Sequence, residues 1–268
     1  MHWPSQREGF RAMPQQSTAP PTIVFPMGGK GERMGAIEVP NKALVELPGA
    51  RKTLLEYSRL TWDVDVERLV LLMPQEADES FAETKDFVSS LDLRCDVRYS
   101  PDPSAKCGRT KALAAAIENG SIPGDRFFIV HNPDDVVINY PGSFAADVVR
   151  RHRENAAKGC AATVVTTDST VHTFTGFRID GERVTRIEHN PVCDTKAHVG
   201  ITVFEPELAG EIVKASRDES SSDFEKDAFE KLAAESRLGY FLLPVACWIA
   251  VNTPKDLSLF EKRFRGGA

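Results

Sequence analysis

Short apolar runs alternate with helical patterns along the first half of the chain, and this alternation constrains the fold more than any other feature. The runs lie at residues 22–27, 69–73 and 126–132, and each has the length of a buried strand. Between them, residues 52–62 place apolar side chains near helical spacing. Residues 108–120 are rich in alanine, a strong helix former, and end in a glycine. This order predicts an α/β fold with a doubly wound, mostly parallel sheet.

Strand-like segments dominate the second half of the chain. They lie at residues 160–167, 176–180, 183–189, 198–206 and 247–251. The dipeptide Asp180–Gly181 joins two of them and is typical of a hairpin turn. Helical patterns occupy residues 206–216, residues 223–236 and the segment after Thr253. No internal repeat is visible, which excludes a β-helix.

Length and charge narrow the classes of function. A chain of 268 residues can bury a full core without disulfides or a structural metal. With 33 Lys and Arg against 39 Asp and Glu, its net charge is −6, so we expect no nucleic-acid partner. No apolar run approaches the ~18 residues of a membrane span, so we expect no membrane partner. The five cysteines form no Cys-x-x-Cys pair, and as free thiols they fit a cytoplasmic location.

The first residues differ in composition from the rest. Residues 1–21 are rich in Gln, Pro, Ser and Arg, and they lack the apolar region of a signal peptide. We therefore expect residues 1–21 to form a flexible N-terminal tail and residues 22–268 to form a single domain. Translation beginning at Met1 or at Met13 is compatible with this division.

A glycine-rich loop follows the first predicted strand and reads MGGKGERMG at residues 27–35. Glycines let the backbone approach a ligand closely and direct amide N–H groups at phosphate oxygens, although many strand-to-helix turns need them for shape alone. Arg33 ends the loop with a planar guanidinium that suits a pyrophosphate, and Lys42 follows shortly after. Pro40 interrupts any long helix here, which disfavours a dinucleotide-binding fold, and the spacing of a P-loop is absent.

The loop and four later segments together resemble the sugar-phosphate nucleotidylyltransferases (NDP-sugar pyrophosphorylases), over about residues 22–262. Residues 29–34 with Asn41-Lys42 resemble the family's G-x-G-x-R-[LM] and P-K signature. Residues 108–113 are similar to its G-T-x-x-A-[IL] segment, and residues 128–134 to a strand that ends in Gly-Asp. Residues 187–191 with 199–201 resemble the E-K-P and N-x-G-[IV]-Y motifs, and residues 248–257 the closing W-x-D-[IV]-x-T-P-x-D-L.

The resemblance implies a Rossmann-like nucleotidyltransferase fold with a small β-rich sugar-binding part. It also implies an enzyme that joins an NTP to a sugar or cyclitol 1-phosphate, with Mg²⁺ or Mn²⁺, to give an NDP-sugar and pyrophosphate. Arg33 and Lys42 would be catalytic, since they would stabilise the charge of the phosphates. The implied nucleotide-binding residues are Gly28, Gly29, Gly31, Gly108 and Thr110. The implied substrate-binding residues are Gly176, Glu188, His198 and Gly200.

The resemblance also indicates two metal ligands. Asp134 follows a predicted strand, and ligands in doubly wound sheets lie at the carboxyl ends of strands. Asp135 is the alternative or holds the loop, and both acids also fit a simple turn. The second ligand of the family is usually the Asp of W-x-D, but that position is Ala250 here. Asn252 matches a variant of the motif and becomes the expected ligand, although it also fits the entry to a helix.

The expected sugar site departs from the family pattern. His189 replaces the lysine of E-K-P, and His198 replaces the asparagine that stands two residues before Gly200. The acceptor is then not necessarily a hexose 1-phosphate. A cytidylyltransferase acting on a non-sugar phosphate and a non-catalytic member that binds nucleotide or sugar phosphate remain alternatives. The base, the acceptor and the oligomeric state stay open, and a homo-oligomer is compatible with the sequence.

Overall fold

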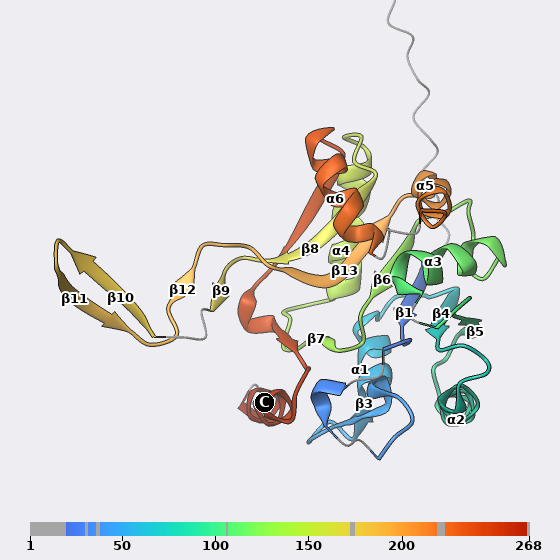
Figure 1. The fold of residues 1–268 in the computed structure, drawn as a ribbon, viewed down its shortest axis with the longest axis horizontal. Coiled ribbons are helices and arrows are strands. Elements are labelled where there is room, and N and C mark those ends of the chain that lie inside the picture. Colours follow the sequence, from blue (N-terminus) through green and yellow to red (C-terminus); the bar gives the residue numbers. More distant parts are fainter. Residues whose placement is uncertain are drawn as a thin grey trace, which may run out of the picture.

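The computed structural model describes residues 20–29, 32–35, 38–105, 107–171, 175–218 and 223–266, so nearly all of the expected tail lies outside it. A seven-stranded sheet forms the centre, in the order β14-β8-β13-β6-β1-β4-β5 (Figure 1). In that order the strands span Leu238–Leu243, Ala162–Thr167, His198–Phe204, Phe128–His131, Thr22–Pro26, Arg68–Met73 and Asp96–Pro101.

The strands of this sheet run in one direction, with one exception. β1 pairs in parallel with β4 and β6, β5 with β4, and β14 with β8, whereas β13 lies antiparallel between β6 and β8. Ile23, Val24 and Phe25 of β1 are all fully buried. Strands that are covered on both faces need continuous apolar runs, which is the pattern the sequence displays. The predicted doubly wound, mostly parallel sheet is confirmed.

Helices cover both faces of the sheet. One face carries α1 (Leu54–Thr61), α2 (Glu79–Ser89) and α4 (Phe144–Ala156). The other face carries α3 (Gly108–Glu118), α5 (Glu207–Ala215) and α6 (Phe224–Ala234). The last helix, α7 (Pro254–Gly266), packs through Phe260 into a third cluster that includes Leu47 and Leu54. In the described part of the chain, no helix combines the length and the apolar character that a membrane crossing requires.

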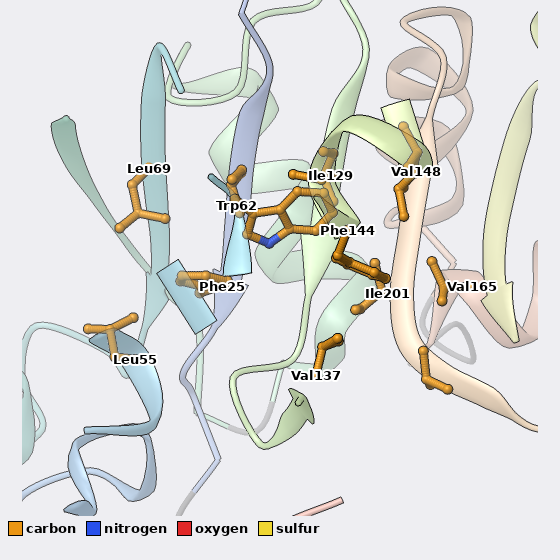
Figure 2. Packing of buried hydrophobic residues seen from close by; sticks show 14 of the residues in the cluster. Phe25, Leu55, Trp62, Leu69, Ile129, Val137, Phe144, Val148, Val165 and Ile201 are labelled. Atoms are coloured by element: carbon orange, nitrogen blue, oxygen red, sulfur yellow. The ribbon is translucent and has the colours of Figure 1, made fainter. Parts of the chain in front are cut away.

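Trp62 is the largest fully buried side chain and lies in the core between the sheet and the first helical layer (Figure 2). The centroid of its ring lies 5.6 Å from that of Phe144 and 5.9 Å from that of His131. Removal of such a side chain costs about 3–5 kcal/mol of stability in other proteins. Trp62 therefore ties α1 and α4 to the strand β6.

Local signals in the sequence explain where two of the helices begin and end. α1 starts at a capping box in which the Thr53 hydroxyl accepts a hydrogen bond from the Glu56 N–H, and the Glu56 carboxylate accepts one from the Thr53 N–H. α3 ends just before Gly120, whose φ of +74° belongs to the left-handed region that favours glycine. Both helices agree with the sequence prediction.

A hairpin of β10 (Gly176–Asp180) and β11 (Arg183–Glu188) extends away from the central sheet (Figure 1). Its turn contains the predicted Asp180–Gly181 dipeptide. The short strands β9 (Thr170–Val171) and β12 (Val192–Cys193) pair at its base. The apolar side chains of the hairpin pack on no core cluster of the described residues. These exposed apolar side chains belong to Phe177, Ile179, Val184 and Ile187.

Two further pairs of short strands lie beside the central sheet. β2 (Glu46–Leu47) pairs with β3 (Lys52–Thr53), and β7 (Asp135–Val137) pairs antiparallel with β15 (Trp248–Ala250). The second pair brings the end of the chain back to the segment that follows β6. The Val251 N–H extends this pairing with a 2.7 Å hydrogen bond to the Asp134 carbonyl.

Candidate functional site

A cavity of about 870 Å³ opens where β1, β4, β5 and β6 end. Its walls are the glycine loop after β1, the segment between β5 and α3, and the turn after β6. Carboxyl ends of parallel strands are the usual place for a ligand in such a sheet. The cavity therefore lies where the sequence places the nucleotide, and Gly28, Gly29 and Arg33 all line it.

Lys42, Asp134 and Asn252 meet in this cavity. The Lys42 Nζ donates to Asp134 Oδ2 at 2.6 Å and to Asn252 Oδ1 at 3.1 Å. Lys42 and Asn252 are separated by 210 positions in the sequence. The two predicted metal ligands and the predicted catalytic lysine thus form one cluster.

Asn41 fixes the backbone beneath Lys42. Its Nδ2 donates to the Met27 carbonyl at 2.7 Å, and its Oδ1 accepts from the Ala43 N–H at 2.9 Å. Asn41 is buried and is the N-cap of the short 3₁₀ helix Lys42–Leu44. The backbone of Lys42 is therefore fixed against the end of β1.

Asn252 lies at the entry to α7, as the simpler interpretation of its motif predicts, yet its side chain is directed at Lys42. The Asp256 carboxylate accepts the backbone N–H groups of Asn252 at 2.9 Å and of Thr253 at 2.7 Å. This cap satisfies the backbone of the helix entry. The Asn252 amide is left to face the cavity, so the two interpretations of the motif are compatible.

Asp134 and Asp135 are neighbours with different surroundings. Asp135 is held inside by Asn132 Nδ2, 3.1 Å from its Oδ2, and by Trp248 Nε1, 3.0 Å from its Oδ1. Burial, reinforced by the nearby Asp134 charge, raises the pKa of Asp135 to about 7. Asp134 instead meets Lys42 in the cavity. The alternative that Asp135 holds the loop agrees with this arrangement.

Gly200 lies directly behind Asp135. A Cβ on Gly200 would stand 2.0 Å from Asp135 Oδ2 and 2.4 Å from Asn132 Nδ2, and its φ is +64°. Its carbonyl also accepts the Asn132 N–H at 3.0 Å. Gly200 is thus placed against the turn after β6, although it is not among the residues that line the cavity.

His131 contacts the same turn through the Asp135 carbonyl, and sequence analysis did not identify this histidine. Trp62 Nε1, which can only donate, lies 3.0 Å from His131 Nδ1. The other ring nitrogen must then carry the proton, and it donates to the Asp135 carbonyl at 2.9 Å. Burial lowers the pKa of His131 to about 4, which keeps the ring neutral. The only signal in the sequence is a histidine at the end of a buried strand.

The start of α3 forms the opposite wall. Gly108 lines the cavity with a φ of +78°, whereas Thr110 is fully buried and is not among the lining residues. Arg109 also lines the cavity and forms an ion pair with Glu225 of α6. The second oxygen of that buried carboxylate accepts the Thr202 hydroxyl at 2.6 Å. Gly31 lies outside the described residues.

The predicted substrate-binding residues are not brought to this cavity. Gly176 and Glu188 lie on the hairpin, where the Glu188 carboxylate is 3.5 Å from Arg178 Nε and 3.2 Å from Arg186 Nε. His198 begins β13, and its Nε2 lies 3.1 Å from the Thr202 hydroxyl. None of these three is among the residues that line the cavity. Their motif predicted a sugar site, and the structure separates it from the glycine loop.

A family model described as "Nucleotidyl transferase" matches residues 24–263. The chain belongs to the nucleotidyl transferase family. A comparison with curated proteins finds no match. The recognition of a nucleotidylyltransferase from the sequence is therefore confirmed at the level of the family.

Solved structures show that this nucleotidyl transferase shares a known fold. A glucose-1-phosphate thymidylyltransferase from Bacillus anthracis in complex with sucrose is 18% identical, with a TM-score of 0.64, and covers 92% of this chain and 96% of its own. A UDP-glucose pyrophosphorylase complexed with UDP-glucose is 14% identical, with the same TM-score, over 93% and 100%. A UTP-bound UGPase from Acinetobacter baumannii is 14% identical, with a TM-score of 0.60, over 92% and 93%.

The donor set of this nucleotidyl transferase fits a hard divalent cation. Asp134 and Asn252 present a carboxylate and an amide oxygen, which are ligands that Mg²⁺ prefers, and both already contact the ammonium group of Lys42. Among the described residues, no three His, Cys, Asp or Glu side chains gather as a metal cluster. The protein oxygens alone are too few for a closed site, which suits a metal that is also bound by substrate phosphates.

Asp102 is a further acid of the cavity, and sequence analysis did not single it out. It follows β5, and its Oδ2 would lie 2.7 Å from a Cβ on Gly28. Burial raises the pKa of Asp102 to about 6, and a hydrogen bond with Cys107 offsets part of that rise. An Asp-Pro pair after a strand reads as an ordinary turn, so the sequence held no signal for this position.

Proposed function

We propose that this nucleotidyl transferase is a sugar-phosphate nucleotidylyltransferase. It would join an NTP to a sugar or cyclitol 1-phosphate and release pyrophosphate. The observation that supports this most is the meeting of Lys42, Asp134 and Asn252 at the cavity beside the glycine loop. A site of this kind combines a fixed cation with oxygen ligands at the place where a triphosphate would lie.

Nucleotidyl transfer needs little covalent help from the protein. The attacking sugar phosphate is already an anion, so no general base is required. The barrier comes from bringing two anions together and from charge that develops on the leaving pyrophosphate. Lys42 would contact the α-phosphate and the attacking oxygen, and Arg33 and the loop amides would hold the departing phosphates.

Asp134 and Asn252 would hold Mg²⁺ or Mn²⁺. When bound, the metal would neutralise part of the phosphate charge. Asp135 and His131 would support Asp134 and would not bind substrate, because Asn132 and Trp248 already engage both carboxylate oxygens of Asp135, and His131 donates to the Asp135 carbonyl. Their part would be to fix the direction of the Asp134 carboxylate before substrate arrives.

Two versions of this function differ in the molecule that accepts the nucleotidyl group. On the sugar-phosphate version, Gly176, Glu188, His198 and Gly200 contact the sugar. Gly176 and Glu188 of the hairpin do not line the cavity, which favours a second candidate, a transfer such as that of a cytidylyltransferase onto a non-sugar phosphate. Both versions use the same nucleotide half of the site.

We infer further that residues 22–268 form one domain that acts in the cytoplasm. The contact of Phe260 with Leu47 and Leu54 joins the end of the chain to its beginning, which supports the first statement. All five cysteines are free thiols, which supports the second. A homo-oligomer remains compatible with both.

The decisive experiment is an assay of pyrophosphate release. Purified protein is incubated with Mg²⁺, each of the five common NTPs, and a panel of sugar 1-phosphates, cyclitol phosphates and non-sugar phosphates. We expect release with one NTP and one class of acceptor, and none after addition of a chelator. Tight NTP binding without turnover on any acceptor would instead favour the non-catalytic alternative.

A further inference from the structure

The backbone and the side chain of Asp102 are both held in place at the wall of the cavity. Its backbone N–H donates to the Met73 carbonyl at 2.9 Å, so the residue continues from the pairing of β5 with β4. Its side chain reaches back across the edge of the sheet to Gly28. A Cβ on Gly28 would stand only 2.7 Å from Asp102 Oδ2, so the absence of a side chain there is what gives the carboxylate its place.

The Lys42 cluster and Asp102 lie beside different strands of the row that borders the cavity. Arg33 belongs to the glycine loop, and Lys42, which follows the loop in sequence, contacts the turn after β6. Asp102 follows β5, which is separated from β6 by β1 and β4. A carboxylate repels phosphate groups, and the third cation of the cavity, Arg109, already pairs with Glu225, so a triphosphate would lie toward Lys42 and Arg33. Asp102 can then contact only the nucleoside, and a contact that selects among nucleotides must be with the base, because the ribose hydroxyls do not distinguish one base from another.

We infer that Asp102 selects the base of the bound nucleotide, and that this base is guanine. The inference rests on the proposed function, because it names the nucleotide of that same site. Guanine presents two neighbouring donors, N1–H and N2–H, that one carboxylate can accept together. Adenine and cytosine offer a single amino group on this edge. In uracil and thymine the one N–H is flanked by two carbonyl oxygens, which a carboxylate repels.

Arg109 supplies the complementary group. It lines the same cavity at the start of α3, two residues after Cys107, the hydrogen-bond partner of Asp102. The buried Glu225 engages Arg109 Nη1 and is itself fixed by Thr202. An arginine matches the O6 and N7 acceptors of guanine, which form the edge adjacent to N1–H and N2–H. An acid and an arginine on the walls of one cavity therefore suit guanine better than any other common base.

The experiment measures nucleotide affinity by calorimetry with the full chain and Mg²⁺. The probes are GTP, ATP, CTP, UTP, dTTP and ITP, because hypoxanthine lacks only the 2-amino group of guanine. We expect GTP to bind at least about tenfold more tightly than ITP, and more tightly than the other four, since one hydrogen bond to a carboxylate is lost in ITP. Asp102→Asn should bring the affinities for GTP and ITP to within about threefold of each other.

Two controls separate the outcomes. Asp92→Asn removes an exposed carboxylate far from the cavity and should keep the preference of the wild type. The ratio of GTP to ITP affinity in the wild type needs no variant, so it decides the matter even if Asp102→Asn folds poorly. Preference for another base, or an unchanged ratio in Asp102→Asn, would overturn this inference and leave the proposed function standing. Absence of both NTP binding and pyrophosphate release would overturn the two together.

Discussion

Lys42 is the residue on which the proposed chemistry depends most. Its ammonium group is held by Asp134 and Asn252 at the cavity, and Asn41 fixes its backbone. Removal of one preorganised hydrogen-bond donor that stabilises developing negative charge commonly costs ~10²–10³ in turnover. We expect Lys42→Ala to lower the rate of pyrophosphate release by about 10²-fold or more, without loss of the fold.

The matched control for this prediction is Lys158→Ala. Lys158 is an exposed lysine just after α4, and its removal should leave the rate unchanged. Thermal unfolding of each variant checks that the fold is retained. A rate for Lys42→Ala within threefold of the wild type would show that this lysine does not contact the transferring phosphates.

Asp135 and His131 give the second prediction at this scale, which concerns pH. The pKa of Asp135 is raised to about 7, so between pH 4 and 7 the folded state holds a proton that the unfolded state has released. Stability from this group therefore falls as pH rises, by up to about 1.4 kcal/mol per pH unit. Asp102, with a pKa raised to about 6, acts in the same direction up to that pH.

His131 acts in the opposite direction. Its pKa is lowered to about 4, so its contribution to stability is present above pH 6.5 and is lost as pH falls toward 4. Asp135→Asn keeps His131, so the difference in stability between the wild type and this variant isolates the Asp135 effect, which acts between pH 4 and 7. Denaturant unfolding of the wild type and Asp135→Asn across this range should show the variant gaining relative stability as pH rises. A difference that does not change with pH would mean that Asp135 is ionised throughout.

At the scale of elements, β13 and the turn after β6 depend on each other through Gly200. A Cβ at this position would collide with both Asp135 and Asn132, and its φ is unfavourable for other residues. We expect Gly200→Ala to lower the free energy of unfolding by about 2 kcal/mol or more and to reduce activity, because the turn that presents Asp134 must shift. Gly124→Ala, with open space around it, should do neither. Equal stability of the two variants in denaturant unfolding would contradict the close packing of Gly200 against Asp135 and Asn132.

The hairpin of β10 and β11 gives a second prediction for elements, which compares two isoleucines. Ile179 on the hairpin is 69% exposed, whereas Ile129 in β6 is fully buried. We expect Ile129→Ala to cost about 2–5 kcal/mol in denaturant unfolding. Ile179→Ala should cost less than about 0.5 kcal/mol. A large loss for Ile179→Ala would show that something covers the hairpin in solution.

The elements also show what sequence patterns can and cannot predict. β1, β4 and β6 were predictable because buried parallel strands read as continuous apolar runs. β5 was not, because it lies at the edge of the sheet and its polar and apolar residues are mixed. Asp134 and Asn252 were recognised by their motifs. Their meeting depends on the pairing of β7 with β15, which joins segments far apart in the chain and leaves no local signal.

At the scale of the whole molecule, the cavity joins the first and last parts of the chain. The glycine loop and Lys42 follow the first strand, β1. Asp134 follows β6 in the middle of the chain, and Asn252 lies at the entry to the last helix, α7. A ligand that contacts all of these residues binds the folded state and does not bind the unfolded state. Such a ligand stabilises the whole fold, by about 2.7 kcal/mol at a concentration 100 times its Kd.

The stabilisation of the fold by a bound nucleotide can be used to test whether Asn252 holds the metal. A neutral amide oxygen carries no charge toward Mg²⁺, so most of the metal affinity must come from Asp134 and from the bound triphosphate. We expect an NTP to raise the Tm of the wild type much more with Mg²⁺ than with a chelator. Asn252→Ala should need a higher Mg²⁺ concentration for the same rise and reach it at saturation. Asp134→Asn should not reach it, because the carboxylate supplies the only charged protein ligand of the pair. If the Mg²⁺ titrations of Asn252→Ala and the wild type coincide, the asparagine only completes the entry to α7.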